Sequence, residues 1–197
     1  MPAPKDLTFR VRKVRPSEVP LLAWFRVPMM HEIAKYEGRP TIIPPHREMR
    51  RYEGWIRREM RRGRLVGFFA VGAEGLPVAA GFVWVQEVAA HPGQTPHWRP
   101  RIQSMYTLPC FRGHGAATKI LEASIAWAKE RGYSRISLRP SPLAGGVYTR
   151  RGFEAVPELH LDLSKKPAGR GSVHAKGKGK PAQRAGRSAS RSRRQPS

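Results

Sequence analysis

Apolar residues in this chain recur with two different periods, and each period predicts one kind of element. Alternating or continuous apolar runs, which are typical of strands, lie at residues 8–14, 65–71, 78–85, 102–108 and 136–138. Apolar residues three and four apart, which are typical of helices on a core, lie at residues 17–25, 29–38, 46–62 and 117–131. A further helix is expected from Pro142 onward. Strands and helices are therefore interspersed over residues 8–153.

Individual residues refine these boundaries. We expect Ser17 to cap the first helix and Pro28 to separate it from the second, because proline lacks the N–H that a helix interior needs. Residues 89–100 are rich in His, Pro and Gly and are expected to form a loop. Three tryptophans fall on apolar faces, which predicts that they belong to the core: Trp24, Trp55 and Trp84.

The segment from residue 106 to residue 117 contains the sharpest local signal. A strand-like run ends at a proline, passes through a turn with two glycines and enters a helix. Gly113 and Gly115 permit positive φ and a close approach of the backbone to an anion, while the first N–H groups and the dipole of the helix attract negative charge. Arg112 adds a cation beside the turn. The pattern predicts a binding site for a pyrophosphate group.

Residues 103–153 resemble the GNAT superfamily of acyl-CoA-dependent N-acyltransferases. Residues 112–117 match its Arg/Gln-x-x-Gly-x-Gly/Ala motif, and residues 148–153 match Tyr-x-x-x-Gly-Phe. The resemblance extends, with no sharp motif, over residues 7–163. It implies an α+β fold in which helices flank a central, mostly antiparallel mixed sheet. It also implies an N-acetyltransferase that uses acetyl-CoA as co-substrate and no metal.

The resemblance assigns roles to individual residues. Cofactor contacts are implied for the end of the central strand, for the turn with the start of its helix, and for one later serine: Met105, Tyr106, Thr107, Arg112, Gly113, His114, Gly115, Ala116, Ala117, Thr118 and Ser141. Only the backbone N–H of His114 is needed, and Ser141 stands where many family members carry an asparagine. Tyr148 is implied as the general acid. Packing of Tyr148 beside Phe153 is the alternative.

The general base is less clearly marked. An acceptor amine with a pKa near ~10.4 is about three units too protonated at pH 7, which costs roughly 4 kcal/mol. Many family members carry a carboxylate on the strand before the turn, but here no Asp or Glu lies between Glu87 and Glu122. Glu32 and Glu87 are the candidate bases, and water is the alternative. Two histidines of the loop are further candidates, and a loop tryptophan is a candidate cover of the acceptor pocket: His91, His97 and Trp98.

Charge divides the chain into two parts. Residues 164–197 contain eleven Lys and Arg, no Asp or Glu, and a matrix of Gly, Ser, Ala and Pro, which predicts a disordered tail after a domain of residues 1–163. The domain keeps 26 basic and 14 acidic residues, a formal charge of +12. The tail is expected to bind nucleic acid without sequence preference. A nucleic-acid-associated protein that uses the fold as an acyl-CoA-binding scaffold is therefore the alternative function.

Other features set outer limits. The single cysteine, Cys110, excludes an internal disulfide and suits a reducing compartment. Residues 1–6 contain no apolar segment typical of a signal peptide, and the longest apolar run is too short to span a bilayer. We therefore expect a cytoplasmic protein, monomeric or homodimeric, with no membrane partner. The acceptor is a small molecule, a peptide N-terminus or a lysine, and the sequence does not choose among them.

Overall fold

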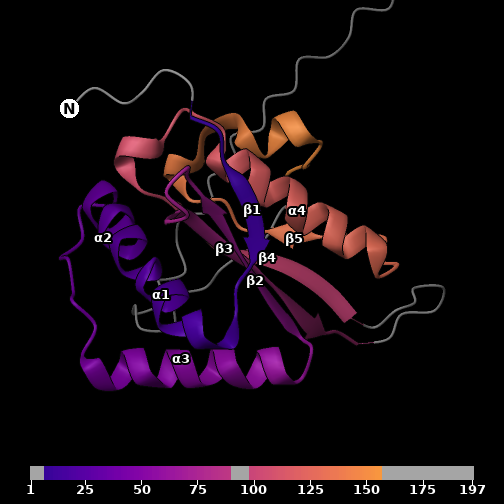
Figure 1. Ribbon diagram of the computed structural model, residues 1–197, viewed down its shortest axis with the longest axis horizontal. Helices are drawn as coiled ribbons and strands as arrows, with labels where there is room; N and C mark the ends of the chain where they lie inside the picture. Colours follow the sequence, from indigo (N-terminus) through magenta and orange to yellow (C-terminus); the bar gives the residue numbers. More distant parts are fainter. Residues whose placement is uncertain (1–6, 90–97, 157–197) are drawn as a thin grey trace, which may run out of the picture. The chain divides into compact units, whose positions relative to one another are not determined.

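The computed structural model describes residues 7–89 and 98–156 (Figure 1). The chain divides into two units, Met1–Glu154 and Ala155–Ser197. The predicted domain boundary at residue 163 and the basic tail lie outside the described residues, as do His91 and His97. The two-part organisation therefore stays a prediction.

A five-stranded sheet forms the centre of the first unit, with its strands in sequence order (Figure 1). The strands are β1 (Arg10–Lys13), β2 (Leu65–Val71), β3 (Pro77–Glu87), β4 (Trp98–Thr107) and β5 (Ser137–Leu138). The first four strands pair antiparallel, and β4 pairs parallel with β5. The sheet is therefore mixed and mostly antiparallel, and each strand coincides with one of the predicted runs to within a few residues.

Helices cover both faces of this sheet. They are α1 (Val19–Trp24), α2 (Arg26–Tyr36), α3 (His46–Arg61) and α4 (Ala116–Glu130), with 3₁₀ turns η1 (Pro16–Glu18), η2 (Pro109–Phe111), η3 (Pro142–Val147) and η4 (Thr149–Arg151). Neighbouring residues of a strand point to opposite faces. Phe68 accordingly packs in one core cluster with Ile120 of α4, while Phe69 packs in the other with Ile56 of α3. Burial on both faces explains why β2 and β3 read as continuous apolar runs.

Three of the local predictions were wrong. Ser17 lies inside η1 and makes no capping hydrogen bond, and the helix breaks at Phe25 instead of Pro28. Pro28 is the third residue of α2, where a missing N–H breaks no intrahelical bond. Trp24 is 48% exposed and packs edge-on against Phe25. Trp55 and Trp84 do pack against the core, with their rings 5.1 Å apart.

The segment after Pro142 also differs from the predicted helix. It forms the two 3₁₀ turns η3 and η4, and Tyr148 lies at the junction between them. Gly152 ends the second turn with φ of +82°, a conformation that glycine adopts without strain. The short turns leave Tyr148 beside Phe153, with ring centroids 6.1 Å apart.

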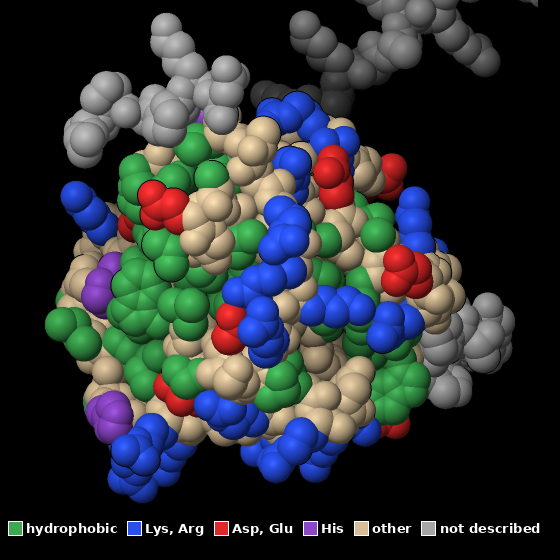
Figure 2. Space-filling view, viewed as in Figure 1, with side chains coloured by type: hydrophobic (Ala, Val, Ile, Leu, Met, Phe, Trp, Pro, Cys, Tyr) green, Lys and Arg blue, Asp and Glu red, His purple; other side chains and the backbone are tan. Residues whose placement is uncertain are grey.

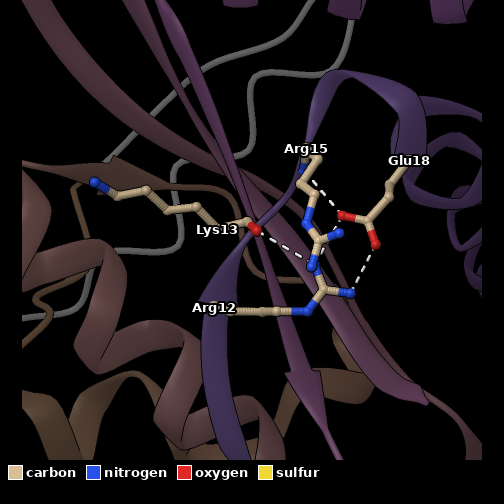
Figure 3. Close-up of polar contacts among 4 residues, drawn as sticks. All are labelled: Arg12, Lys13, Arg15 and Glu18. Atoms are coloured by element: carbon tan, nitrogen blue, oxygen red, sulfur yellow. Dashed lines mark hydrogen bonds and ion pairs between the residues drawn. The ribbon is translucent and has the colours of Figure 1, made fainter. Parts of the chain in front are cut away.

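An ion pair fixes the connection from β1 to α1 (Figure 3). The Arg12 guanidinium donates two hydrogen bonds of 2.7 Å to the two carboxylate oxygens of Glu18, and the Arg15 backbone N–H donates a third at 2.9 Å. The hydrogen bonds from Arg12 lower the pKa of Glu18 to about 2. A carboxylate whose pKa is depressed by folding stabilises the fold above its unfolded pKa of ~4.5.

We predict that Glu18→Gln lowers the free energy of unfolding by about 1–2 kcal/mol at pH 7, because the charge-assisted bonds from Arg12 are lost. The difference between the variant and the native chain should shrink as the pH falls from about 4.5 to 2, since Glu18 becomes protonated there. Urea unfolding of both chains at several pH values measures it. A difference that is unchanged at pH 2 would contradict the assignment.

Candidate active site

A bulge in β4 shapes the middle of the site. In the register of β3 with β4, Ala80 faces Tyr106 and Phe82 faces Gln103, so Gly81 alone stands opposite two residues, Ser104 and Met105. A Cβ on Gly81 would lie 2.9 Å from Cγ of Met105, which explains the glycine. Bulges of this kind bend a strand and redirect its side chains.

Ser104 carries the backbone strain of the bulge. Its φ of +52° is the only positive value at a non-glycine residue within the described part of the chain. Nη1 of Arg26 in α2 donates a hydrogen bond of 3.0 Å to its Oγ, which also lies 3.3 Å from the Tyr52 hydroxyl of α3. The Arg26 guanidinium itself stacks over the Tyr52 ring at 5.0 Å. Two helices therefore hold the strained residue in place.

Two adjoining cavities open where β4 and β5 separate. The parallel pairing of the two strands ends at Ile102 and Leu138, just before the bulge. Beyond it lie a cavity of about 450 Å³ and a second of about 400 Å³. The two share lining residues from α2, from the bulge and from the segment after β5: Met29, Ile33, Met105, Ser141 and Tyr148.

The predicted anion turn forms one wall of the larger cavity. Gly113 and Gly115 adopt φ of +80° and +85°, and no atom lies within 4 Å of the place where a Cβ would stand on either. Gly115 precedes α4, and no side chain caps the first N–H groups of this helix. Those groups belong to Ala116, Ala117 and Thr118, which line the cavity. Their free donors and the helix dipole together favour an anion.

One carboxylate, Glu32 of α2, lines the same cavity and bonds to Arg112 of the turn. Nη2 of Arg112 donates to both of its oxygens, at 2.8 and 2.7 Å, and the Tyr106 hydroxyl donates at 2.7 Å. Nε of Arg112 donates to the carbonyl oxygen of Thr107 at 3.0 Å. Burial raises the pKa of Glu32, but the bonds from Arg112 and Tyr106 outweigh it and the net pKa is lowered. Glu32 is therefore an ionised and weakly basic carboxylate.

Burial followed by the bond to Glu32 raises the pKa of Tyr106 to about 12. Tyr148 lines both cavities, and burial raises its pKa as well. Both hydroxyls are thus protonated near neutral pH. Tyr148 therefore presents a protonated hydroxyl group where the two cavities adjoin, so it is placed to donate a proton there.

Most of the predicted site residues line the larger cavity together. They are Glu32, Met105, Tyr106, Thr107, Arg112, Gly113, Gly115, Ala116, Ala117, Thr118, Ser141 and Tyr148. His114 lies within the turn but does not line either cavity. Glu87 is exposed and pairs with Trp98 at the far end of β4, nine residues or about 30 Å from Thr107.

Trp98 belongs to β4 and not to a loop, and it lines neither cavity. The Arg64 guanidinium stacks over its ring at 4.6 Å. The predicted loop of residues 89–100 is thus too long at its C-terminal end, because residues 98–100 pair with β3. Within the described part of the chain, no group of three His, Cys, Asp or Glu side chains is placed to hold a metal ion. No helix of that part is both long and apolar enough to cross a membrane.

Several features of the site escaped the sequence analysis. The bond from Tyr106 to Glu32 joins residues 74 apart in sequence, and the Arg112–Glu32 ion pair joins residues 80 apart. The apolar pattern did not indicate the bulge. The signal that could have indicated it is Gly81, an isolated glycine within a strand, which is often found beside a bulge. Arg150, which lines the larger cavity, is a variable position of the second motif.

Comparison with known proteins places this geometry in context. A sequence model described as the acetyltransferase (GNAT) family matches residues 28–153. No curated protein matches the chain significantly in sequence. Solved structures do match it in shape, and their similarity confirms the predicted α+β fold with a mixed sheet between helices.

Three of these structures illustrate the range of sequence identity and structural similarity. A predicted acetyltransferase from Clostridium acetobutylicum, solved with acetyl-CoA, is 23% identical with a TM-score of 0.70, over 82% of this chain and 100% of that one. A GCN5-related N-acetyltransferase from Ralstonia eutropha JMP134 is 20% identical with a TM-score of 0.69, over 80% and 100%. An aminoglycoside N-acetyltransferase in complex with CoA is 15% identical with a TM-score of 0.58, over 84% and 99%.

The Tyr106–Glu32 bond makes a testable prediction about titration. We expect the Tyr106 hydroxyl to titrate at about pH 12, and Glu32→Gln to lower that pKa toward the ordinary 10, because the neutral amide no longer opposes the phenolate charge. NMR titration of ¹³C-labelled tyrosine rings measures it, with Tyr106→Phe to assign the signal. Tyr106 titrating near 10 in the native chain would show that the bond does not form.

Proposed function

Because the chain belongs to the acetyltransferase (GNAT) family, we propose that it transfers the acetyl group of acetyl-CoA to a primary amine by direct attack. Family membership confirms the resemblance of residues 112–117 and 148–153, and it establishes an acetyl-CoA-dependent acetyltransferase with acetyl-CoA as co-substrate. The amine acceptor and the roles of individual residues are the proposal. The observation that carries it is the anion turn, Tyr148 and Glu32 lining one cavity.

The turn between η2 and α4 would hold the pyrophosphate of acetyl-CoA. Its uncapped N–H groups are fixed in direction by Gly113 and Gly115, so they can bind phosphate oxygens without rearranging. The backbone of Met105 to Thr107 would contact the acetyl and pantetheine parts, because this segment begins within the bulge and does not pair with β5. Ser141 lines both cavities across from it and offers one hydroxyl to the pantetheine.

The acceptor would approach through the second cavity. Its lining is apolar along α2 and the ends of β4 and β5, and its polar groups include Gln103, Ser104 and the guanidinium of Arg139. Glu37, the one carboxylate among its described lining residues, is paired with Arg39. Such a lining suits an amine carried on a small molecule, a peptide N-terminus or a lysine side chain. Tyr148 lies where the two cavities adjoin, so the thioester and the amine would meet beside it.

Proton movements follow from these positions. The neutral amine attacks the thioester carbonyl carbon, the bond from carbon to sulfur breaks, and the departing thiolate takes the proton of the Tyr148 hydroxyl. The surplus proton on the new amide nitrogen passes to water or to a carboxylate, and the Tyr148 phenolate takes a proton back from water, which restores its hydroxyl. Glu32 is the one carboxylate among the described lining residues of the larger cavity, which keeps it as the candidate acceptor of that proton.

The ion pair limits how strong a base Glu32 can be. Arg112 and Tyr106 already donate three hydrogen bonds to its two oxygens, and its pKa is lowered. Deprotonation of an ammonium by this carboxylate is therefore uphill, so we propose that a water molecule relays the proton and that turnover rises with pH. Glu87 lies too far from the cavities to act in this step without a large movement.

Replacing Gly115 tests the turn. We predict that Gly115→Val lowers acetyl-CoA affinity at least tenfold, because a β-branched residue disfavours φ of +85° and so misdirects the first N–H groups of α4. Gly132→Val is the matched control, since Gly132 has φ of +74°, similar open surroundings and a place just beyond the other end of α4. Calorimetry on both folded variants measures it. Equal losses in the two would remove the turn from the binding site.

Replacing Tyr148 tests the acid. We predict that Tyr148→Phe lowers turnover by about 10² to 10⁴ with little change in acetyl-CoA affinity, because only the proton is removed and the ring still packs on Phe153. Tyr133→Phe, a packing tyrosine beside Trp127, is the control. Thiol release from acetyl-CoA with a panel of amines measures both. A Tyr148→Phe variant as active as the control would leave Tyr148 with packing alone.

The same assay separates the enzyme from the alternative function. Amine-dependent thiol release by the native chain supports acetyl transfer to an amine. Acetyl-CoA binding without release for any amine of the panel would favour the acyl-CoA-binding scaffold of a nucleic-acid-associated protein.

A further inference from the structure

The outward face of α3 consists almost entirely of arginine. Six arginines and one glycine occupy it: Arg47, Arg50, Arg51, Gly54, Arg58, Arg61 and Arg62, the last being the C-cap. All seven are exposed. At 3.6 residues per turn they fall within about a third of the helix circumference, and the part from Arg47 to Arg61 extends for about 21 Å along the helix. We call these seven positions the arginine face; Figure 2 shows basic side chains along the lower edge of the molecule, where α3 lies in Figure 1.

Most of this charge is uncompensated inside the domain. Arg58 and Arg62 lie 3.6 and 3.1 Å from the buried carboxylate of Glu59. Within the described part of the chain, no carboxylate pairs with Arg47, Arg50, Arg51 or Arg61. The remaining acidic residues of α3, Glu48 and Glu53, lie to the sides of the arginine face. A surface of one sign therefore extends along the whole helix.

Arg58, Arg61 and Arg62 lie at the C-terminal end of α3, where the helix dipole favours cations, but three other properties of the arginine face are unfavourable for the isolated domain. Arg47 lies in the first turn of α3, where the helix dipole disfavours a cation. Arg47 and Arg51 are like charges four residues apart, and they repel because no carboxylate of the described residues pairs with either. Gly54 lies in the middle of an exposed helical face with no protein atom near its Cβ position, so the domain gains no packing from it. All three properties suit a surface that a polyanion covers closely.

We propose that the arginine face of α3 binds the phosphate backbone of a nucleic acid. Every cation on the face is arginine, and the chain has no lysine between Lys35 and Lys119. The guanidinium fork matches two phosphate oxygens at once, which an ammonium cannot do. The bare backbone at Gly54 lets the strand approach the middle of the helix. A length of about 21 Å spans several successive phosphates.

A lipid surface fits these observations less well. Amphipathic helices bind membranes by inserting their apolar face. The apolar face of α3 is already used inside the protein, because Ile56 is fully buried and Tyr52, Trp55 and Met60 pack against the same core. Only the charged side of the helix is available to a partner. The site is also separate from the catalytic one, since no residue of α3 lines either cavity.

A charge-matched pair of variants in the full chain tests the proposal. Arg47→Gln/Arg51→Gln/Arg61→Gln removes three charges from the arginine face, and Lys13→Gln/Lys129→Gln/Arg135→Gln removes three exposed charges from β1, α4 and the segment before β5. Fluorescence anisotropy measures the affinity for a 20-base-pair RNA duplex, the same DNA duplex and a single strand, at 50 to 200 mM salt. The basic tail is present in every sample, so its contribution is the same throughout.

We expect the arginine-face variant to lose at least tenfold in affinity at 150 mM salt, and its slope of log K against log salt to fall by about 2 to 3. The control should lose less than threefold and keep its slope. Both variants should keep the amine-dependent thiol release of the native chain, which separates this inference from the proposed function. The single variants Arg47→Gln, Arg51→Gln and Arg61→Gln repeat the measurement if the triple variant does not fold.

Two results would overturn the proposal. Equal losses of affinity in the two triple variants would mean that total charge, and not the arginine face, sets the affinity. No loss of affinity in either would mean that another part of the chain, such as the tail, binds the nucleic acid. Arginine-face-dependent binding to phosphatidylserine vesicles, with no such dependence for any nucleic acid, would identify a lipid surface as the partner.

Discussion

The bulge in β4 is the constraint on which the rest of the site depends. Because Gly81 has no side chain, two residues of β4 fit opposite it, and the strand then turns away from β5. The β4–β5 pairing ends at Ile102 and Leu138, directly before the bulge, and both cavities are lined by residues beyond that point. The strained φ of Ser104 is tolerated because Arg26 and Tyr52 hold its hydroxyl from two helices. The fold of α1 to α3 on one face of the sheet thus supports the opening at its edge.

Arg112 joins three parts of the structure at this opening. Its side chain bonds Glu32 of α2 and the Thr107 carbonyl at the end of β4, and its backbone begins the turn that leads to α4. The guanidinium also lies 5.2 Å from the centre of the Tyr106 ring. The position of α2 relative to the turn is therefore fixed by charge as well as by packing. An anion bound at the turn would compete with Glu32 for the same guanidinium, so cofactor binding and the basicity of Glu32 are expected to be linked.

The sequence predicted the elements well because their periods are set locally. The strands of the sheet and α3 were placed to within a few residues, and the glycines of the turn were assigned from the φ angles that a tight turn requires. Errors occurred where a neighbour in space decides the outcome. The apolar pattern of residues 17–25 predicts that Trp24 is buried, but the packing of α1 leaves it exposed to solvent. The composition of residues 89–100 predicts a loop at Trp98, but its pairing with β3 makes it part of a strand.

The site was predictable in its motifs and not in its contacts. The turn and Tyr148 are recognisable because they are contiguous in sequence, and the structure brings them to one cavity. The ion pair of Glu32 with Arg112 depends on how α2 packs beside β4, which no local pattern encodes. Arg150 shows the same limit, since its place at the cavity follows from the 3₁₀ turn η4, which replaced part of the predicted helix.

The two faces of helix α3 are subject to different constraints. Its inner face is fixed by the core, where Ile56 is buried and Tyr52 stacks on Trp55 while reaching Ser104. Packing of that face, and not helix propensity, supplies most of the stability of a helix in a folded domain. The outer face is therefore free to hold residues that weaken an isolated helix, including a central glycine and a row of like charges. The arginine face lines neither cavity and takes no part in the core, so its cations are available to the partner that we propose.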